Sequence, residues 1–389
     1  MKLACVVHRF GADIAGGSEG HCRAIALRLA ERHDVTVLTS TARDHVTWTE
    51  SFPAGTSMDG SLRVVRFPVV RRRSLHRFSE ATEIATSSTA SEAEQEDWFR
   101  ENGPEVPGLL DHLRDHASDY DRVLFWSFRY YQSFFGLPIV AARSVLVPTA
   151  EDDQIVRLDV LDRFFRQPAG FLFLTPEEKA LVERRSSSRL PPSRVIGTGL
   201  EQAPPPPPRR VLDAHDVAGP FLLYLGRIDP NKGCDALIDH YLHWHDGAVA
   251  ERRAPLVMAG PANMPLPEHP MIRRLGYVAD EVREALLAHA TALVVPSPYE
   301  SLSLVLLEAW NHGTPALVNG RCDVLRGQAQ RANGALYYRD AEEFAKGVEW
   351  LLSHPAEART MGRQGQQYVE REYRWPRVMG TIEELLASV

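Results

Sequence analysis

A run of prolines near the middle of the chain places the strongest constraint on how it can fold. Residues 203–210 read APPPPPRR, and proline fits neither a helix interior nor a central strand, because it lacks the N–H donor and fixes φ. The run predicts a linker between two folded parts, and a proline-rich recognition motif is the alternative interpretation. A chain of 389 residues is longer than a single hydrophobic core usually organises. We therefore expect domains at 1–200 and 211–372, joined by a linker at 201–210.

Before the proline run, short apolar segments alternate with loops and amphipathic segments. The loop Gly16-Gly17-Ser18 joins a first apolar run to an amphipathic segment at 22–32, which is the order strand, loop, helix and strand of a parallel βαβ unit. Its spacing, GGSEG, is not the GxGxxG of a nicotinamide-binding loop. The strands that we expect in this part are 3–7, 35–39, 62–70, 123–128, 144–147, 171–174 and, with a turn, 195–200.

A second series of the same kind follows the proline run. Its expected strands are 221–225, 256–259, 274–278, 292–295 and 315–318, separated by helical segments. The sequence therefore predicts an α/β protein with two Rossmann-like, doubly wound domains. In such folds ligands bind beyond the carboxyl ends of the strands, so we expect the two crevices to face each other across a cleft.

Composition narrows the class of protein. The net charge of −7 disfavours a nucleic-acid partner. The four cysteines have no paired spacing, which suggests neither disulfides nor a zinc site and fits a reducing cytoplasm. Arg71-Arg72-Arg73 and Arg77 form a basic run that is typical of a solvated face, with contact to an anionic substrate or to the inner face of the membrane as the alternative.

Two carboxylates mark the stretch Ser297 to Pro315. Glu300 lies in a turn-like loop before a helix predicted over 303–310, and Glu308 lies about two turns inside that helix. A helix start carries partial positive charge and unpaired N–H groups, so it attracts anions. Ser301 and Ser303 add hydroxyl donors there. A carboxylate at the mouth of an anion site suits hydroxyls attached to a phosphate, although Glu300 also fits an ordinary first-turn acid.

Two cations follow the first strand of the second series. Arg227 and Lys232 are separated by the turn IDPN, so both can reach one point beyond the strand end. Paired cations suit a diphosphate leaving group, whose developing charge must be stabilised. A basic pair on the surface is the alternative interpretation.

Taken together and in this order, five segments resemble the retaining GT-B glycosyltransferases of family 4, which use nucleotide sugars. The resemblance covers nearly the whole chain. The segments are Gly16-Gly17-Ser18-Glu19, GRIDPNKG at 226–233, MAGP at 258–261, LGYV at 275–278, and the pair Glu300 and Glu308.

The resemblance implies a role for each matched residue. Arg227 and Lys232 would bind the diphosphate, Glu300 would contact the donor sugar near its reacting carbon, and Glu308 would bind the ribose hydroxyls. Residues 373–389 would form a helix that crosses back onto the N-terminal, acceptor-binding domain. The other donor-binding positions that it implies are Gly16, Gly17, Gly226, Gly260, Tyr277, Val278, Ser301, Leu302, Ser303 and Leu304.

The chain departs from the family pattern at two places. Ser301-Leu302-Ser303 replaces a segment that usually contains glycines, and serine still permits N–H donation. Relatives commonly carry a His-Asp pair where this chain has Thr149-Ala150-Glu151-Asp152-Asp153. Glu151 stands where that histidine is expected. We expect Glu151 to be catalytic, as an acceptor of hydroxyl hydrogen bonds or as a stabiliser of positive charge on an oxocarbenium-like transition state.

The expected activity is transfer of a sugar from a nucleoside diphosphate sugar to an acceptor hydroxyl, with no metal ion and no other cofactor. The acceptor would be a glycan, a lipid-linked glycan or a small molecule. We expect a cytoplasmic location, with the inner face of the membrane as a site of peripheral contact. The alternatives are a GT-B epimerase or phosphorylase, or a non-catalytic subunit that binds nucleotide or glycan.

Overall fold

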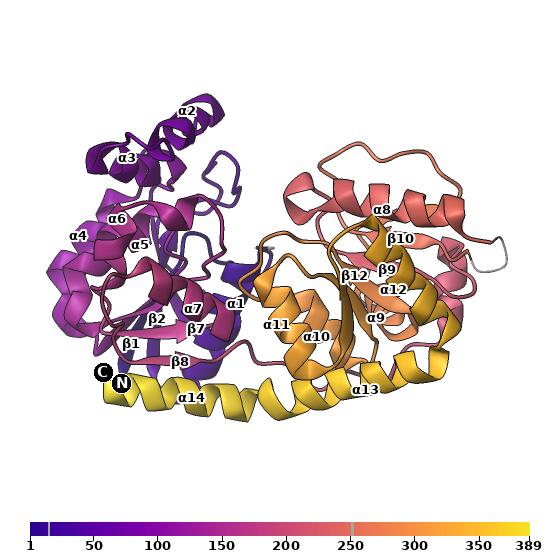
Figure 1. Cartoon of the computed structure of the whole chain (residues 1–389). Helices are drawn as coiled ribbons and strands as arrows, with labels where there is room; N and C mark the ends of the chain where they lie inside the picture. The colour runs from indigo at the N-terminus through magenta and orange to yellow at the C-terminus, as the bar shows by residue number, and fades with distance from the viewer. Residues whose placement is uncertain (15, 250–252) are drawn as a thin grey trace. The chain divides into compact units, whose positions relative to one another are not determined.

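A computed structural model describes residues 1–14, 16–249 and 253–389 (Figure 1). The chain divides into two compact units: unit 1 comprises Met1–Gly199 and Trp375–Val389, and unit 2 comprises Leu200–Arg374. The proline run lies in unit 2, where the Pro207 carbonyl accepts a hydrogen bond from His289 Nε2 (2.7 Å). Within the described ranges, no helix combines the length and apolar character needed to cross a bilayer.

Unit 1 is built on a sheet of eight strands among its described residues, in the order β3-β4-β2-β1-β5-β6-β7-β8. Neighbouring strands are parallel except β3 and β4, which pair antiparallel at one edge. The carboxyl ends of the parallel strands therefore share one side of the sheet, where α/β folds place ligands. The strands are β1 (Lys2–Val6), β2 (Asp34–Ser40), β3 (Gly55–Asp59), β4 (Leu62–Phe67), β5 (Arg122–Trp126), β6 (Ser144–Val147), β7 (Gly170–Phe173) and β8 (Ser193–Val195).

The helices of unit 1 include the last helix of the chain. α14, drawn in yellow in Figure 1, packs against α1 and β8. Two contacts tie it there: the Arg28 guanidinium lies 5.0 Å from the centre of the Trp375 ring, and His33 Nε2 lies 3.1 Å from a Glu383 carboxylate oxygen. The helices are α1 (Gly17–Leu29), α2 (Leu75–Ala85), α3 (Glu92–Asn102), α4 (Pro107–His116), α5 (Tyr131–Gly136), α6 (Val160–Phe165), α7 (Pro176–Arg185) and α14 (Trp375–Ser388).

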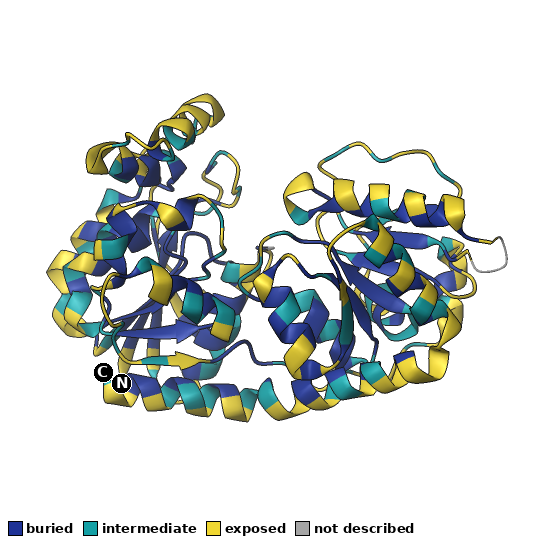
Figure 2. Ribbon diagram, in the orientation of Figure 1, coloured by how far each residue is buried: buried dark blue, intermediate teal, exposed yellow. Residues whose placement is uncertain are grey.

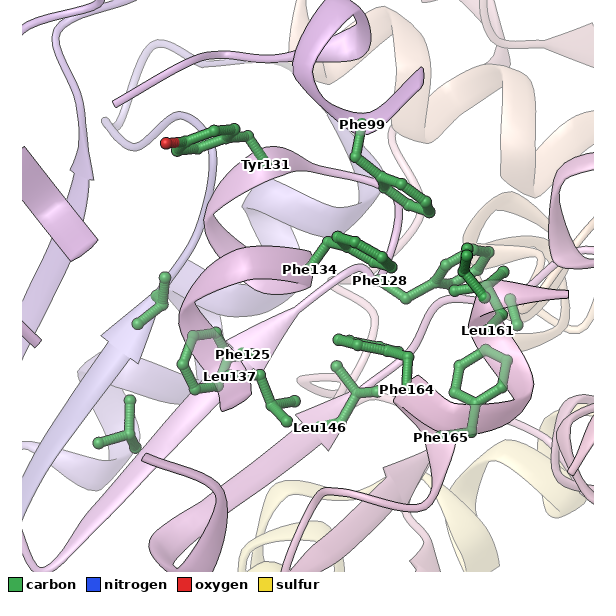
Figure 3. Packing of buried hydrophobic residues seen from close by; sticks show 14 of the residues in the cluster. Phe99, Phe125, Phe128, Tyr131, Phe134, Leu137, Leu146, Leu161, Phe164 and Phe165 are labelled. Atoms are coloured by element: carbon green, nitrogen blue, oxygen red, sulfur yellow. The ribbon is translucent and has the colours of Figure 1, made fainter. Parts of the chain in front are cut away.

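Aromatic side chains fill much of the core of unit 1 (Figure 3). Phe99 and Phe134 stack with ring centroids 3.8 Å apart. Phe164 also stacks on Phe134, with ring centroids 5.4 Å apart. The central strands of both units are almost wholly buried, whereas the outer faces of the helices are exposed (Figure 2). Burial of this apolar surface holds each sheet against its covering helices.

The basic run of unit 1 is engaged by the chain's own acceptors. Arg71 pairs with Glu101 at 2.8 Å and with Glu105 at 2.7 Å. Arg73 donates to the Asn102 carbonyl from Nε at 2.9 Å and its guanidinium lies over the Trp48 ring. These two side chains clamp the segment after β4 onto the end of α3, which is a structural role.

Unit 2 contains six strands in its described part, all parallel, in the order β11-β10-β9-β12-β13-β14. The strands are β9 (Leu222–Leu225), β10 (Leu256–Ala259), β11 (Ile272–Gly276), β12 (Ala292–Val295), β13 (Ala316–Asn319) and β14 (Ala335–Tyr338). The helices are α8 (Cys234–Gly247), α9 (Asp280–His289), α10 (Leu304–Asn311), α11 (Asp323–Ala332), α12 (Ala341–Ser353) and α13 (Pro355–Glu372).

Most expected strands lie within two residues of the observed ones, but three expectations were wrong. Residues 195–200 do not form a strand: β8 ends at Val195, and Gly197 has a φ of 60°. The helix expected at 22–32 is observed at Gly17–Leu29, so it begins and ends earlier in the chain than expected. The strand expected at 62–70 ends at Phe67. Two edge strands, β3 and β14, were not expected, since an edge strand needs neither strong alternation nor full burial.

Backbone contact between α13 and the turn after α10 generates a stability prediction. A Cβ built on Gly362 would lie 1.9 Å from the Gly313 carbonyl oxygen, whereas one built on Gly380 of α14 meets nothing within 4 Å. We expect Gly362→Ala to lower the free energy of unfolding by about 2 kcal/mol or more, because backbone must move to relieve the overlap. Gly380→Ala should raise it by about 0.5–1 kcal/mol through helix propensity. Urea denaturation of both variants checks this, and equal effects would contradict it.

Candidate functional site

Glycines at the carboxyl ends of β9 and β10 bring two turns of unit 2 into backbone contact. Gly226 follows β9 with a φ of 145°, and Gly260 follows β10 with a φ of 137°. A Cβ on Gly260 would lie 1.9 Å from the Gly226 carbonyl oxygen, so only glycine fits there. Gly260 N donates to the Gly276 carbonyl at 2.7 Å. This hydrogen bond joins the end of β11 to the turns after β9 and β10.

The turn after Gly226 carries the two expected cations. Lys232 Nζ lies 2.9 Å from Glu300 Oε1, so the structure brings these two predicted site residues together. Arg227 Nε lies 3.5 Å from Asp229 Oδ2, and the Arg227 side chain is 41% exposed. Gly233, with a φ of 71°, packs against the backbone before Glu300, since a Cβ there would lie 2.5 Å from the Pro296 carbonyl. Convergence of both cations on one phosphate stays a prediction.

The start of α10 holds a buried polar side chain without a partner among the described residues. Ser303 is the N-cap residue, is 2% exposed, and its hydroxyl has no hydrogen-bond partner within the described chain. The Gln328 side chain of α11 is fully buried beside it, and Gln328 Oε1 accepts from Ser303 N at 3.4 Å. A buried hydroxyl without a partner costs free energy unless another group uses it. Leu302 is buried, whereas Ser301 and Leu304 are half-buried at the same helix end.

Glu308 lies on α10 and contacts α9. Its Oε2 pairs with Arg283, whose other nitrogen Nη1 lies 2.8 Å from Glu284 Oε1. Burial raises the pKa of Glu308 above its ordinary value, and Arg283 opposes this shift. Sequence reasoning did not find Arg283, because a pair between two helices leaves no local spacing signal.

The turn after β11 carries two further predicted residues. Tyr277 is 87% exposed, and Val278 is half-buried just before α9 begins. An aromatic ring that is this exposed at the ligand side of a sheet offers a face for a planar group. The structure places both residues on the expected side of unit 2.

In unit 1, the first turn of α1 is occupied by a carboxylate of the chain itself. The Glu19 carboxylate folds back over Gly16, where a Cβ would lie 2.2 Å from one of its oxygens. His8 Nε2 donates to Glu19 Oε1 at 2.9 Å, and Arg9 pairs with the same oxygen. Burial opposes ionisation of Glu19, but His8 and Arg9 more than offset it, and the pKa of Glu19 is lowered to about 2. Gly16 and Gly17 are themselves exposed.

Glu151 lies beyond the end of β6 in unit 1. Arg129, which follows β5, has Nη2 at 2.7 Å from Asp153 Oδ2 and at 3.6 Å from Glu151 Oε2. The backbone at both strand ends is unusual, since Ser127 and Thr149 have φ values of 63° and 48°. Positive φ at a β-branched residue is strained, and such strain tends to occur at functional sites.

A buried carboxyl supports the loop that carries Glu151. Glu178 Oε1 accepts from Ala150 N at 2.7 Å, and its Oε2 accepts from Leu174 N at 2.5 Å. Burial raises the pKa of Glu178 to about 8, while these N–H donors oppose the shift. Thr175 caps α7, and Glu178 on that helix joins the loops after β6 and β7 through its two oxygens.

Comparison with known proteins identifies the class of fold. The family described as "Glycosyl transferases group 1" matches residues 219–354. A D-inositol 3-phosphate glycosyltransferase of Frankia alni is 33% identical over 162 residues, which is 36% of this chain and 38% of the relative's own length. The match thus spans well under half of that relative.

Solved structures match over the whole chain. Sucrose-phosphate synthase from Thermosynechococcus elongatus has a TM-score of 0.72 and 17% identity, with all of both chains covered. HepE of Anabaena, in complex with UDP and glucose, has a TM-score of 0.71 and 14% identity, again with all of both chains covered. The chain therefore has the two-domain α/β fold with parallel sheets of the GT-B glycosyltransferases, as predicted.

The buried Glu19 cluster generates a prediction about acid stability. The folded-state pKa of Glu19, about 2, lies below the value of 4.5 for an unperturbed glutamate. Its contribution to stability is therefore present above about pH 4.5 and is lost as pH falls towards 2. We expect wild-type protein to lose about 3 kcal/mol more than Glu19→Gln over this interval.

Urea denaturation at a series of pH values measures this difference. Glu31, which is exposed and lies just after α1, supplies a control, and Glu31→Gln should leave the acid dependence unchanged. Parallel curves for wild type and Glu19→Gln would contradict the prediction.

Proposed function

We propose that this chain is a retaining glycosyltransferase of family 4, which transfers a sugar from a nucleoside diphosphate sugar to an acceptor hydroxyl. Two features around the start of α10 carry the proposal. Lys232 is bonded to Glu300 in the loop that leads into α10, and the buried Ser303 hydroxyl at the start of α10 has no partner within the described chain. The first supplies a cation beside a carboxylate, and the second supplies a donor at a helix start. Together they suit a sugar attached to a phosphate.

The proposed reaction exchanges one bond at the anomeric carbon. The bond from that carbon to the β-phosphate oxygen breaks, and the acceptor oxygen bonds to the carbon on the same face, so the configuration is retained. The acceptor proton passes to the leaving phosphate. Arg227, Lys232 and the N–H groups of α10 would stabilise the charge on the departing diphosphate, so the proposal requires no metal ion.

Carboxylates would bind the neutral parts of the donor. Glu300, oriented by Lys232 at 2.9 Å, would accept hydrogen bonds from sugar hydroxyls, and Glu308 would accept them from the ribose. Glu151 would act at the reacting carbon, where its negative charge would stabilise an oxocarbenium-like transition state. Arg129 Nη2 lies 3.6 Å from Glu151 Oε2, so a cation of unit 1 lies close to this carboxylate.

The remaining donor contacts would come from the glycine turns. Gly16 and Gly17 of unit 1 and Gly226 and Gly260 of unit 2 would let backbone approach the diphosphate, and Tyr277 with Val278 would lie near the base. HepE, which shares the fold, was determined with UDP and glucose, and this supports a nucleoside diphosphate as the first ligand to test.

The acceptor would bind to unit 1. We propose a glycan, a lipid-linked glycan or a small-molecule alcohol, used in the synthesis of a cell-surface polysaccharide, a glycolipid or a glycosylated metabolite in the cytoplasm. The matched relative from Frankia alni is named for inositol 3-phosphate, which makes cyclic polyols a reasonable first set of acceptors.

Binding of UDP, ADP and GDP tests the phosphate assignment. A nucleotide at 100 times its dissociation constant should stabilise the protein by about 2.7 kcal/mol, which a thermal-shift assay detects. Lys232→Ala and Arg227→Ala should each weaken binding about 10- to 100-fold through loss of a charge-assisted contact. Arg339→Ala is a matched control, since it removes an exposed Arg–Glu pair of unit 2. Unchanged affinity in both variants would contradict the assignment.

Glu151→Gln tests the catalytic assignment in unit 1. We expect slower release of UDP from UDP-glucose by about 10- to 100-fold, with unchanged UDP affinity, because the charge would act only on the transition state. Asp152→Asn is the control, since Asp152 is an exposed neighbour paired with Arg157 at 3.1 Å. Full activity in Glu151→Gln would refute the role. Analysis of the sugar product separates transfer or hydrolysis from epimerisation.

A further inference from the structure

Four side chains on and after two helices of unit 2 form a continuous series of polar contacts. His312 Nε2, just beyond α10, lies 2.6 Å from Glu284 Oε2. Glu284 Oε1 lies 2.8 Å from Arg283 Nη1, and Arg283 Nη2 pairs with Glu308 Oε2. The His312 side chain is 5% exposed, so this end of the series is fixed in the packed interior. The series leads outward from there to Glu308.

The two oxygens of Glu308 have different surroundings. Oε2 is engaged by Arg283, whereas Oε1 accepts no hydrogen bond from the described residues. The Glu308 side chain is 30% exposed, so solvent or a ligand can reach it. Arg283 therefore fixes the carboxylate through one oxygen and leaves the other available to a hydroxyl donor.

The charges around Glu308 come from the two helices that flank it. Arg283 and Glu284 face it from α9, and His312 faces it from the end of α10. Burial and Glu284 disfavour the charged form of Glu308, whereas Arg283 and His312 favour it. Of these, Arg283 is the cation in direct contact, so it has the largest part in keeping the carboxylate an acceptor.

We propose that Arg283 is a positioning residue for nucleotide recognition, which orients Glu308 so that its second oxygen accepts hydrogen bonds from the ribose hydroxyls. The inference rests on the proposed function, because it deepens the role of Glu308. Glu284 and His312 hold Arg283 in turn. The arrangement makes α9 part of the donor site although Arg283 itself need not touch the nucleotide.

Discrimination between UDP and 2′-deoxy-UDP provides a readout that a merely structural ion pair would not change. A carboxylate fixed to accept from ribose hydroxyls favours UDP over the deoxy analogue, and we expect wild type to do so about 10- to 100-fold. Arg283→Ala should bring this ratio close to that of Glu308→Gln, which lacks the charge. Arg283→Lys, which retains a cation, should restore part of it. Arg339→Ala should match wild type.

The pH dependence of UDP affinity is the second readout. A ribose hydroxyl donates to the ionised carboxylate, so affinity falls as pH falls through the pKa of Glu308. Without Arg283 that pKa moves further up, so Arg283→Ala should lose affinity at a higher pH than wild type, by up to about tenfold per pH unit. Glu308→Gln should abolish this dependence, also in the double variant.

Isothermal titration calorimetry with UDP and 2′-deoxy-UDP from pH 5 to 8 yields both readouts. Equal discrimination and parallel pH curves in wild type and Arg283→Ala, with UDP binding intact, would overturn this inference and leave the proposed function standing. Absence of binding of UDP, ADP and GDP by wild type would overturn both. If Arg283→Ala does not fold, Arg283→Lys and Glu308→Gln supply the test. The role would be refuted if Arg283→Lys had the same UDP to 2′-deoxy-UDP affinity ratio and the same pH curve as wild type, and Glu308→Gln also kept the wild-type ratio.

Discussion

The close approach of backbone at the ends of β9 and β10 is the constraint on which the unit 2 site depends. Because the Gly226 carbonyl lies where a side chain of Gly260 would be, the two turns form one layer of peptide groups. Lys232 and the loop before α10 are positioned by that layer, since Gly233 packs directly on the Pro296 carbonyl. A side chain at Gly233 would collide with the Pro296 carbonyl, so it would displace the turn that carries Lys232 and the loop that carries Glu300 together.

Charges in the candidate site are organised as pairs before any ligand is considered. Lys232 pairs with Glu300, Arg283 with Glu308, and Arg129 with Asp153. Such pairs contribute little to stability when they are exposed. Their effect is to restrict side chains that would otherwise sample many rotamers, so the entropy of ordering them is not lost again on binding.

The sheets and the glycine turns could be predicted from the sequence because those features depend on local residue patterns. Apolar runs between turn residues predicted most of the strands, and the pairing of Lys232 with Glu300 follows from their positions after neighbouring strands. The missed residues share a different property. Glu19 was noted only as part of a motif, and Arg283 was not noted, because their partners lie on other elements and are set by packing and not by local spacing. The polar edge strand β3 escaped for a related reason, since an edge pairs on one side only.

The route of the chain through unit 1 has a consequence for biosynthesis. α14 covers α1 and β8, yet it is made after all of unit 2. While the ribosome is still making residues 200–374, unit 1 lacks the helix against which Gly170 and Gly199 pack, through Leu385 and Trp375 respectively. Unit 1 therefore completes its core only after unit 2 has been synthesised, although N-terminal domains commonly fold first during synthesis. Loss of residues 375–389 would expose the surface of α1 that α14 covers, although α1 lies near the other end of the sequence.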